Sequence, residues 1–205
     1  MRPLKPGVRF GYMSIEYSPE IFVEQFPLVK LFLYHITYFR EINDSYKTTQ
    51  SKSVFWTYTI NAHLLQATMT WCMVFGAEGC NQTHWKKLSS EECEILQSSF
   101  RNRLSESIDL SMEQWNDYWL KVTTFRNKYV AHRELNYDYP VPNFSNAIKV
   151  ALFYDKWIRE LISPDILEEP SLKDFVSDLK SSIRPLIDKI LSVTKEHNLL
   201  IEQQL

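Results

Sequence analysis

One stretch of sequence decides the fold: MEQWNDYWLKVTTFRNKYVAHRE, residues 112–134. Successive residues of an α-helix are rotated by about 100°, and at that spacing the large apolar side chains of this stretch fall on one arc. They are Met112, Trp115, Tyr118, Trp119, Val122, Phe125 and Tyr129. Ser111 and Gln114 have the spacing of a capping box at a helix start. The sequence therefore predicts an amphipathic helix over residues 112–134 that packs one face against a core.

Helical spacing of apolar residues recurs on both sides of this stretch, with almost no strand-like alternation. The further helices are expected over residues 18–46, 52–75, 90–103, 144–162 and 172–197. Ser90, followed by Glu91 and Glu92, predicts the start of the third by N-capping, and Pro185 is expected to kink the last. No repeat or long linker divides the chain. We therefore expect an all-α, up-and-down bundle of about five to six helices, forming a single domain over residues 1–205.

Composition excludes several classes of function. The 205 residues are 44% hydrophobic and 23% charged, as in ordinary globular proteins. The chain has only four glycines and nine prolines. Folds that bind phosphate through Gly-rich loops are therefore disfavoured. The net charge of −2 is not that of a protein that binds polyanions over its whole surface. Any anion site must therefore be local.

The cysteines argue against disulfides and metal. Cys72, Cys80 and Cys93 are odd in number and show no Cys-x-x-Cys spacing. Together with His84 they match no zinc pattern, so we expect neither a metal site nor a cofactor. A reducing, cytoplasmic location is the simplest interpretation. No apolar stretch reaches the roughly 18 residues of a membrane span, so no membrane association is expected.

Residues 121–133 carry a local excess of positive charge. Lys121, Arg126, Lys128 and Arg133 occur there without any acidic residue, which predicts an anion site. Arg126 and His132 are six residues apart. On an ideal helix they would lie about 9 Å apart along the axis and about 120° apart around it, on the two edges of the apolar arc.

This segment resembles a known family. Arg126 followed by Asn127, four further residues and His132 resembles the Arg-x(4–6)-His motif of the HEPN superfamily. The run 125–134, with residues 71–76 and 84–88 upstream, looks like the abortive-infection U branch of that superfamily. The similarity covers about residues 53–134, whereas the C-terminal helices, about 144–197, carry no signature. Glu134 departs from the branch, in which aspartate is common.

The resemblance implies a helical bundle that forms a homodimer around the motif helix and cleaves RNA without a metal, as a toxin or phage-defence protein. It implies that Arg126 binds the phosphate, His132 moves the proton and Asn127 orients either group. The side chains that would bind the flanking RNA are Lys121, Lys128 and Arg133. An antitoxin protein would be a further partner.

Two other functions are compatible with the same residues. An arginine at the edge of an apolar stripe usually lays its stem on the core, and a histidine in a last helical turn is often only a favourable helix-end cation. The chain would then be a non-catalytic HEPN-like module that binds RNA or a nucleotide, or a helical protein-interaction module. The aromatic arc is interpreted as core rather than as a base-stacking platform.

Overall fold

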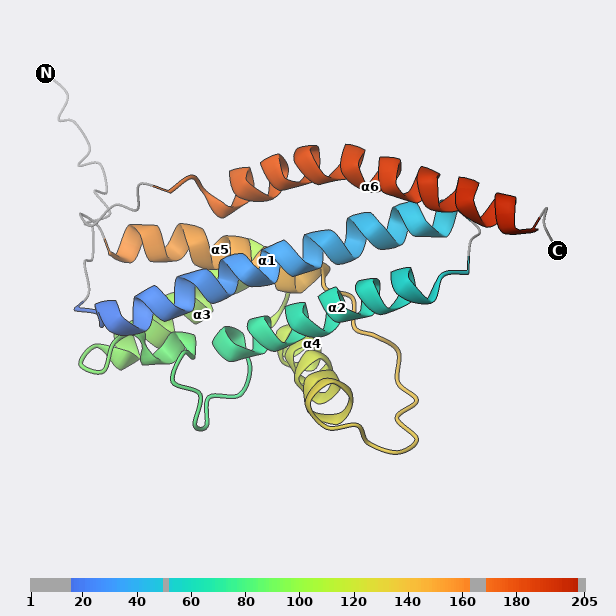
Figure 1. Ribbon diagram of the computed structural model, residues 1–205. Helices are drawn as coiled ribbons and strands as arrows, with labels where there is room; N and C mark the ends of the chain where they lie inside the picture. Colours follow the sequence, from blue (N-terminus) through green and yellow to red (C-terminus); the bar gives the residue numbers. More distant parts are fainter. Residues whose placement is uncertain (1–15, 50–51, 163–168, 203–205) are drawn as a thin grey trace, which may run out of the picture.

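The computed structural model describes residues 16–49, 52–162 and 169–202, and every regular element within these ranges is helical (Figure 1). The α-helices are α1 (Pro19–Thr48), α2 (Val54–Phe75), α3 (Cys93–Ile108), α4 (Met112–Phe125), α5 (Ser145–Leu161) and α6 (Leu172–Glu202). Two short helices, η1 (Trp85–Leu88) and η2 (Arg126–Ala131), are of the 3-10 and π types. The predicted all-α bundle is confirmed. None of the helices in the described part of the chain is long and apolar enough to span a bilayer.

α1 and α2 form a long antiparallel pair at the centre of the bundle (Figure 1). Each begins at a serine whose hydroxyl accepts a backbone N–H of the first turn: Ser18 from Ile21 at 3.3 Å and Ser53 from Trp56 at 3.5 Å. α1 buries Phe32, Leu33 and other apolar side chains on several sides, as its sequence predicts. These two helices provide the support on which the remaining elements pack.

The apolar interior has two parts. The larger cluster takes residues from α1 to α5, with Trp71 of α2 and Trp157 of α5 fully buried in it. The smaller cluster joins the end of α1, the start of α2 and one face of α6, where Ile183 and Ile187 are buried. α6 thus packs on the α1/α2 pair at the end remote from η1. It continues as one helix through Pro185, which lies on its exposed side, and curves over the bundle (Figure 1).

A buried polar network ties three distant segments together. The Gln25 side chain donates from Nε2 to the carbonyl of His84 at 2.9 Å, and its Oε1 accepts from the hydroxyl of Tyr154 at 2.8 Å. All three residues are buried. A buried polar group without a hydrogen-bond partner lowers stability, so loss of any one of these three residues would leave a buried group of another unpaired. The network fixes the loop before η1 against α1 and α5.

α3 differs from its predicted bounds at both ends. It begins at Cys93 rather than at Ser90: the hydroxyl of Ser89 accepts the N–H of Glu92 at 3.1 Å, and Ser90 makes no capping hydrogen bond to any residue that the structure describes. It continues five residues beyond the expected end at 103, to Ile108. Ile108 is fully buried, so packing against the core extends the helix. Asp109, at φ 56°, ends it in the left-handed conformation.

α4 runs across the direction of α1 and α2 and is seen nearly end-on in Figure 1. Two hydrogen bonds hold it in place. The Trp119 indole N–H donates to the carbonyl of Phe75 at the end of α2, at 2.8 Å. The Tyr118 hydroxyl accepts the backbone N–H of Ala147 in α5, at 3.0 Å. The middle of α4, just before the basic segment that begins at Lys121, is therefore anchored to both neighbours.

Candidate functional site

The predicted motif helix has two parts. Its start is as expected: Ser111 and Gln114 form a capping box, with the Gln114 N–H donating to the Ser111 hydroxyl and the Ser111 N–H to Gln114 Oε1. The α-helix ends at Phe125, however, and Arg126–Ala131 form a π-helical turn. π turns are rare and occur frequently at functional sites.

The expectation of one continuous helix to residue 134 is therefore wrong. His132 already has extended backbone, at φ −125° and ψ 126°, and its N–H donates to the carbonyl of Asn127 at 3.2 Å. Tyr129 in the turn stacks on Phe125 and is covered by Tyr137 from the following loop, with ring centroids 5.1 and 5.6 Å apart. Tertiary contacts of this kind override helical propensity. The ideal-helix geometry between Arg126 and His132 consequently does not apply.

Arg126 is half-buried at the start of the π turn. Its Nη1 donates to Asn127 Oδ1 at 2.8 Å, and its Nε is buried without a hydrogen-bond partner within the described part of the chain. Burial raises the pKa of the Cys72 thiol to about 12, and the positive charge of Arg126 opposes part of that rise. The guanidinium is thus close to the end of α2. A buried N–H donor without a partner favours an acceptor from outside the chain.

A cavity of about 480 Å³ lies beside this guanidinium. Arg126 and Asn127 line it together with Thr123 of α4, and its opposite wall comes from the end of α2 and the loop that follows. In that wall the Asn81 amide donates to the carbonyl of Met73. We call it the Arg126 cavity. The structure thus brings together Arg126 and Asn127, two of the three residues predicted to be catalytic.

His132, the third, lies outside this cavity. It is exposed directly beyond the π turn and does not line the cavity. Among the described residues, its imidazole has no hydrogen bond or ion pair. One chain therefore does not place this imidazole beside the Arg126 cavity.

The three basic residues predicted to bind RNA differ in their surroundings. Lys128 forms an ion pair with Glu134 at 3.1 Å. The Arg133 guanidinium lies over the Tyr129 ring, 4.1 Å from its centroid, in a cation–π contact. Lys121 is exposed on α4 and makes no ion pair within the described ranges. Lys121 is therefore the one of the three that has no such contact with another described residue.

His84 has a structural role that sequence reasoning missed. Its Nδ1 accepts the N–H of Lys86 at 3.3 Å, so the neutral ring carries its proton on Nε2, which donates to the carbonyl of Gly76 at 3.1 Å. Burial lowers the pKa of His84 to about 4, and the charge of Lys86 adds to this effect. The imidazole therefore closes the loop between α2 and η1 as a neutral hydrogen-bonding group. The sequence offered only a His-Trp-Lys-Lys run as a signal.

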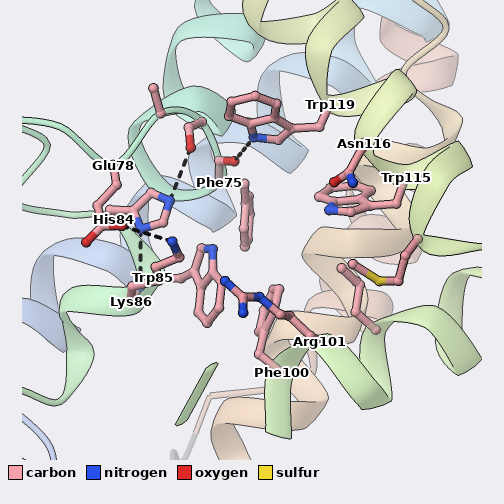
Figure 2. Close-up of a pocket in the computed structure, with 14 residues that line it drawn as sticks. Phe75, Glu78, His84, Trp85, Lys86, Phe100, Arg101, Trp115, Asn116 and Trp119 are labelled. Atoms are coloured by element: carbon pink, nitrogen blue, oxygen red, sulfur yellow. Dashed lines mark hydrogen bonds and ion pairs between the residues drawn. The ribbon is translucent and has the colours of Figure 1, made fainter. Parts of the chain in front are cut away.

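A second cavity, of about 360 Å³, opens on the other side of this loop (Figure 2). Its aromatic walls come from α2, η1, α3 and α4, and its rim carries Arg101 and Asn116. The ring-bearing residues are Phe75, His84, Trp85, Phe100, Trp115 and Trp119. We call it the aromatic cavity.

The aromatic arc of α4 packs against the core, as its interpretation from sequence predicts, although several of its side chains are only partly buried. Val122 and Phe125 are buried, whereas Trp115, Trp119 and Tyr129 are half-buried and Met112 is exposed. The reason is that α4 crosses the bundle and meets the core mainly with its C-terminal half. Trp115 and Tyr118 in its N-terminal half also pack against the core, and Trp115 borders the aromatic cavity as well.

No cluster of three or more His, Cys, Asp or Glu side chains that could hold a metal ion occurs among the described residues. Cys72 is buried, Cys93 is partly exposed and Cys80 is exposed, and all three are free thiols. Comparison with protein-family models, with curated proteins and with solved structures gave no match to the chain.

Proposed function

We propose that the protein is a metal-independent endoribonuclease of the HEPN type, acting in the cytoplasm as a toxin or in phage defence. The observation that carries this proposal is the Arg126 guanidinium: half-buried in a π turn, held by Asn127, and lining a cavity with a buried Nε that lacks a partner. Such a group suits a phosphate, because a guanidinium offers several N–H donors to an anion.

The reaction is an intramolecular transfer. The ribose 2′-oxygen attacks the adjacent phosphorus, a new O2′–P bond forms, and the P–O5′ bond breaks. A base takes the 2′-hydroxyl proton and an acid gives a proton to the leaving 5′-oxygen, which leaves a 2′,3′-cyclic phosphate and a 5′-hydroxyl. Arg126 stabilises the charge on the pentacovalent phosphorus, and His132 transfers the proton, because an imidazole nitrogen can serve as general base and then as general acid.

The active unit in this proposal is a two-fold dimer. One chain leaves His132 outside the Arg126 cavity, so the imidazole that serves this cavity comes from the second copy. An isologous interface supplies it twice, because two-fold symmetry brings the same surface together on both sides. The dimer also doubles the local positive charge. Lys121, Lys128 and Arg133 then bind the flanking backbone, after Lys128 exchanges Glu134 for a phosphate.

The test is cleavage of a fluorescent single-stranded RNA in EDTA. Wild type is expected to cut it and to leave a 2′,3′-cyclic phosphate, detected by mass spectrometry. Arg126→Ala and His132→Ala are expected to lower the rate at least about 100-fold. Arg184→Ala, a change of the same type at an exposed position of α6, is the control and should retain the rate. Activity that needs added zinc or magnesium would refute the mechanism.

The same assay separates the two other functions. Salt-sensitive RNA binding without any turnover identifies a non-catalytic RNA-binding module. A chain that neither binds nor cleaves RNA, and whose activity in cells survives charge reversal at Lys121 and Lys128, is a protein-interaction module. An antitoxin partner is tested by co-expression with the neighbouring reading frame.

A further inference from the structure

The aromatic cavity has the construction of a base-binding site. At its base, the Trp85 and Phe100 rings stack with centroids 3.9 Å apart and an interplanar angle of 17°. Trp115 and Trp119 approach from α4 and are only half-buried, so part of each indole borders the cavity (Figure 2). The volume of about 360 Å³ falls in the range of small-ligand sites, which are mostly apolar with a few polar groups.

The polar groups at the rim are available for recognition. Asn116 is exposed beside Trp115, and its amide makes no hydrogen bond to any described residue. Arg101 is exposed and uses one nitrogen, Nη2, in a 3.2 Å bond to Gln97 on its own helix. Glu78, by contrast, is occupied by two lysines, which pair with its carboxylate oxygens at 2.9 and 3.4 Å. The free rim groups are therefore one amide and one cation.

The aromatic cavity and the Arg126 cavity are neighbours along α4. Ala77 lines both. α4 gives Asn116 and Trp119 to the first, whereas Arg126 lines the second. With a rise of 1.5 Å per residue, the seven residues from Trp119 to Arg126 span about 10 Å. A single nucleic acid strand lying along this helix would reach both cavities.

We propose that the aromatic cavity binds a nucleobase of the single-stranded RNA whose phosphate lies at Arg126. The base stacks on the exposed indole surface, the Asn116 amide bonds to the base edge, and Arg101 attracts the adjoining phosphate. Stacking on aromatic side chains and charge attraction are the usual means of holding single strands. This assignment rests on the proposed function, because it uses RNA as the ligand of Arg126.

Binding to a strand that cannot be cleaved tests the assignment independently of catalysis. The probe is a short oligonucleotide with 2′-O-methyl riboses throughout, which removes the attacking hydroxyl, and its partner is the same strand with abasic positions. Affinity is measured by fluorescence anisotropy of the labelled strand. Asn116→Ala and Arg101→Gln lie on exposed positions, so neither disturbs the core. Asn102→Ala, an exposed asparagine on α3 outside both cavities, is the matched control.

Wild type is expected to bind the base-bearing strand about tenfold more tightly than the abasic one. Asn116→Ala should reduce this difference, because the hydrogen bond to the base edge is lost while the stacking remains, and should leave the abasic affinity unchanged. Arg101→Gln should weaken binding of both the base-bearing and the abasic strand. Asn102→Ala should change neither affinity. Equal affinity of wild type for the two strands, or a full base preference in Asn116→Ala, would overturn the assignment. If wild type prefers the base-bearing strand but does not cleave natural RNA, the proposed catalysis is refuted and the base-binding assignment is supported.

Discussion

The indole N–H of Trp119 donates to the backbone carbonyl of Phe75 at 2.8 Å, joining the middle of α4 to the end of α2. Trp119 is half-buried and lines the aromatic cavity, and Arg126 lies seven residues further along the chain. The bond therefore fixes α4 relative to the loop after α2, which contributes to the walls of both cavities.

Substitution of Trp119 tests this anchor. Trp119→Phe keeps a ring but leaves the carbonyl unpaired, and should lower the free energy of unfolding by about 1 kcal/mol. Trp119→Ala also removes the packing and should cost about 3 kcal/mol. Urea unfolding followed by circular dichroism measures both. Leu120→Ala, next to it on the exposed side of α4, should cost under about 0.5 kcal/mol. Equal stability of Trp119→Phe and wild type would show that the hydrogen bond contributes nothing.

Gly76 tests the turn at the end of α2. A Cβ at this position would lie 2.5 Å from the carbonyl oxygen of Cys72, which is backbone and cannot move aside. Gly76→Ala should therefore cost more than about 2 kcal/mol in unfolding free energy. Gly79→Ala is the comparison, because a Cβ there meets no atom within 4 Å and only the φ of +28° is unfavourable. Gly79→Ala should lower the free energy of unfolding by about 1 kcal/mol. A larger loss in Gly79→Ala than in Gly76→Ala would refute the clash at Gly76.

Acid is expected to destabilise the fold through His84. Its pKa is about 4 in the folded protein and 6.5 ordinarily, so the unfolded chain binds more protons between these values. Stability is complete above pH 6.5 and falls as pH drops toward 4, by about 2 kcal/mol between pH 7 and pH 5. Burial lowers the pKa of His35 and His63 as well, which adds in the same direction. His84→Gln should show a shallower dependence in urea unfolding at the two pH values. If His84→Gln lost as much unfolding free energy as wild type between pH 7 and pH 5, His84 would not be the source of the acid sensitivity.

The three thiols should react at different rates. Cys80 is exposed and should react first with a thiol-specific disulfide reagent, and Cys93, which is partly covered, should follow. Burial holds the pKa of Cys72 at about 12, so its thiolate is scarce and it should react only on unfolding. Peptide mapping after timed labelling identifies each site. Early modification of Cys72 would show that the end of α2 opens in the folded protein.

Subunit mixing tests the shared site. Arg126→Ala and His132→Ala proteins, each inactive alone, are mixed under conditions that exchange subunits. If Arg126 of one chain acts with His132 of the other, the mixed dimer retains one intact pair and about a quarter of the wild-type rate, since half the dimers are mixed and each has one of two sites. No activity in the mixture, once subunit exchange has been verified, would contradict the pairing of Arg126 with His132 of the other chain. An active monomer by light scattering would reject the dimer itself.

The sequence by itself determined the fold class and most helix positions. Apolar residues at helical spacing place α1, α2, α5 and α6 within a few residues, because burial of one face is encoded locally. The capping box at Ser111 likewise fixed the start of α4, since both of its hydrogen bonds lie within four residues. The grouping of Arg126 with Asn127 followed from their being adjacent in the chain.

Only the tertiary structure decided the rest. Tyr137 packs on Tyr129 across a loop, and the π turn that ends before His132 occurs where these rings meet, which no local periodicity encodes. The buried network of Gln25, His84 and Tyr154 joins residues up to 129 positions apart. The two cavities arise because α4 crosses the bundle, so aromatic residues with the spacing of a core become the walls of an open site. Contacts between residues distant in sequence, rather than spacing along the chain, place these groups.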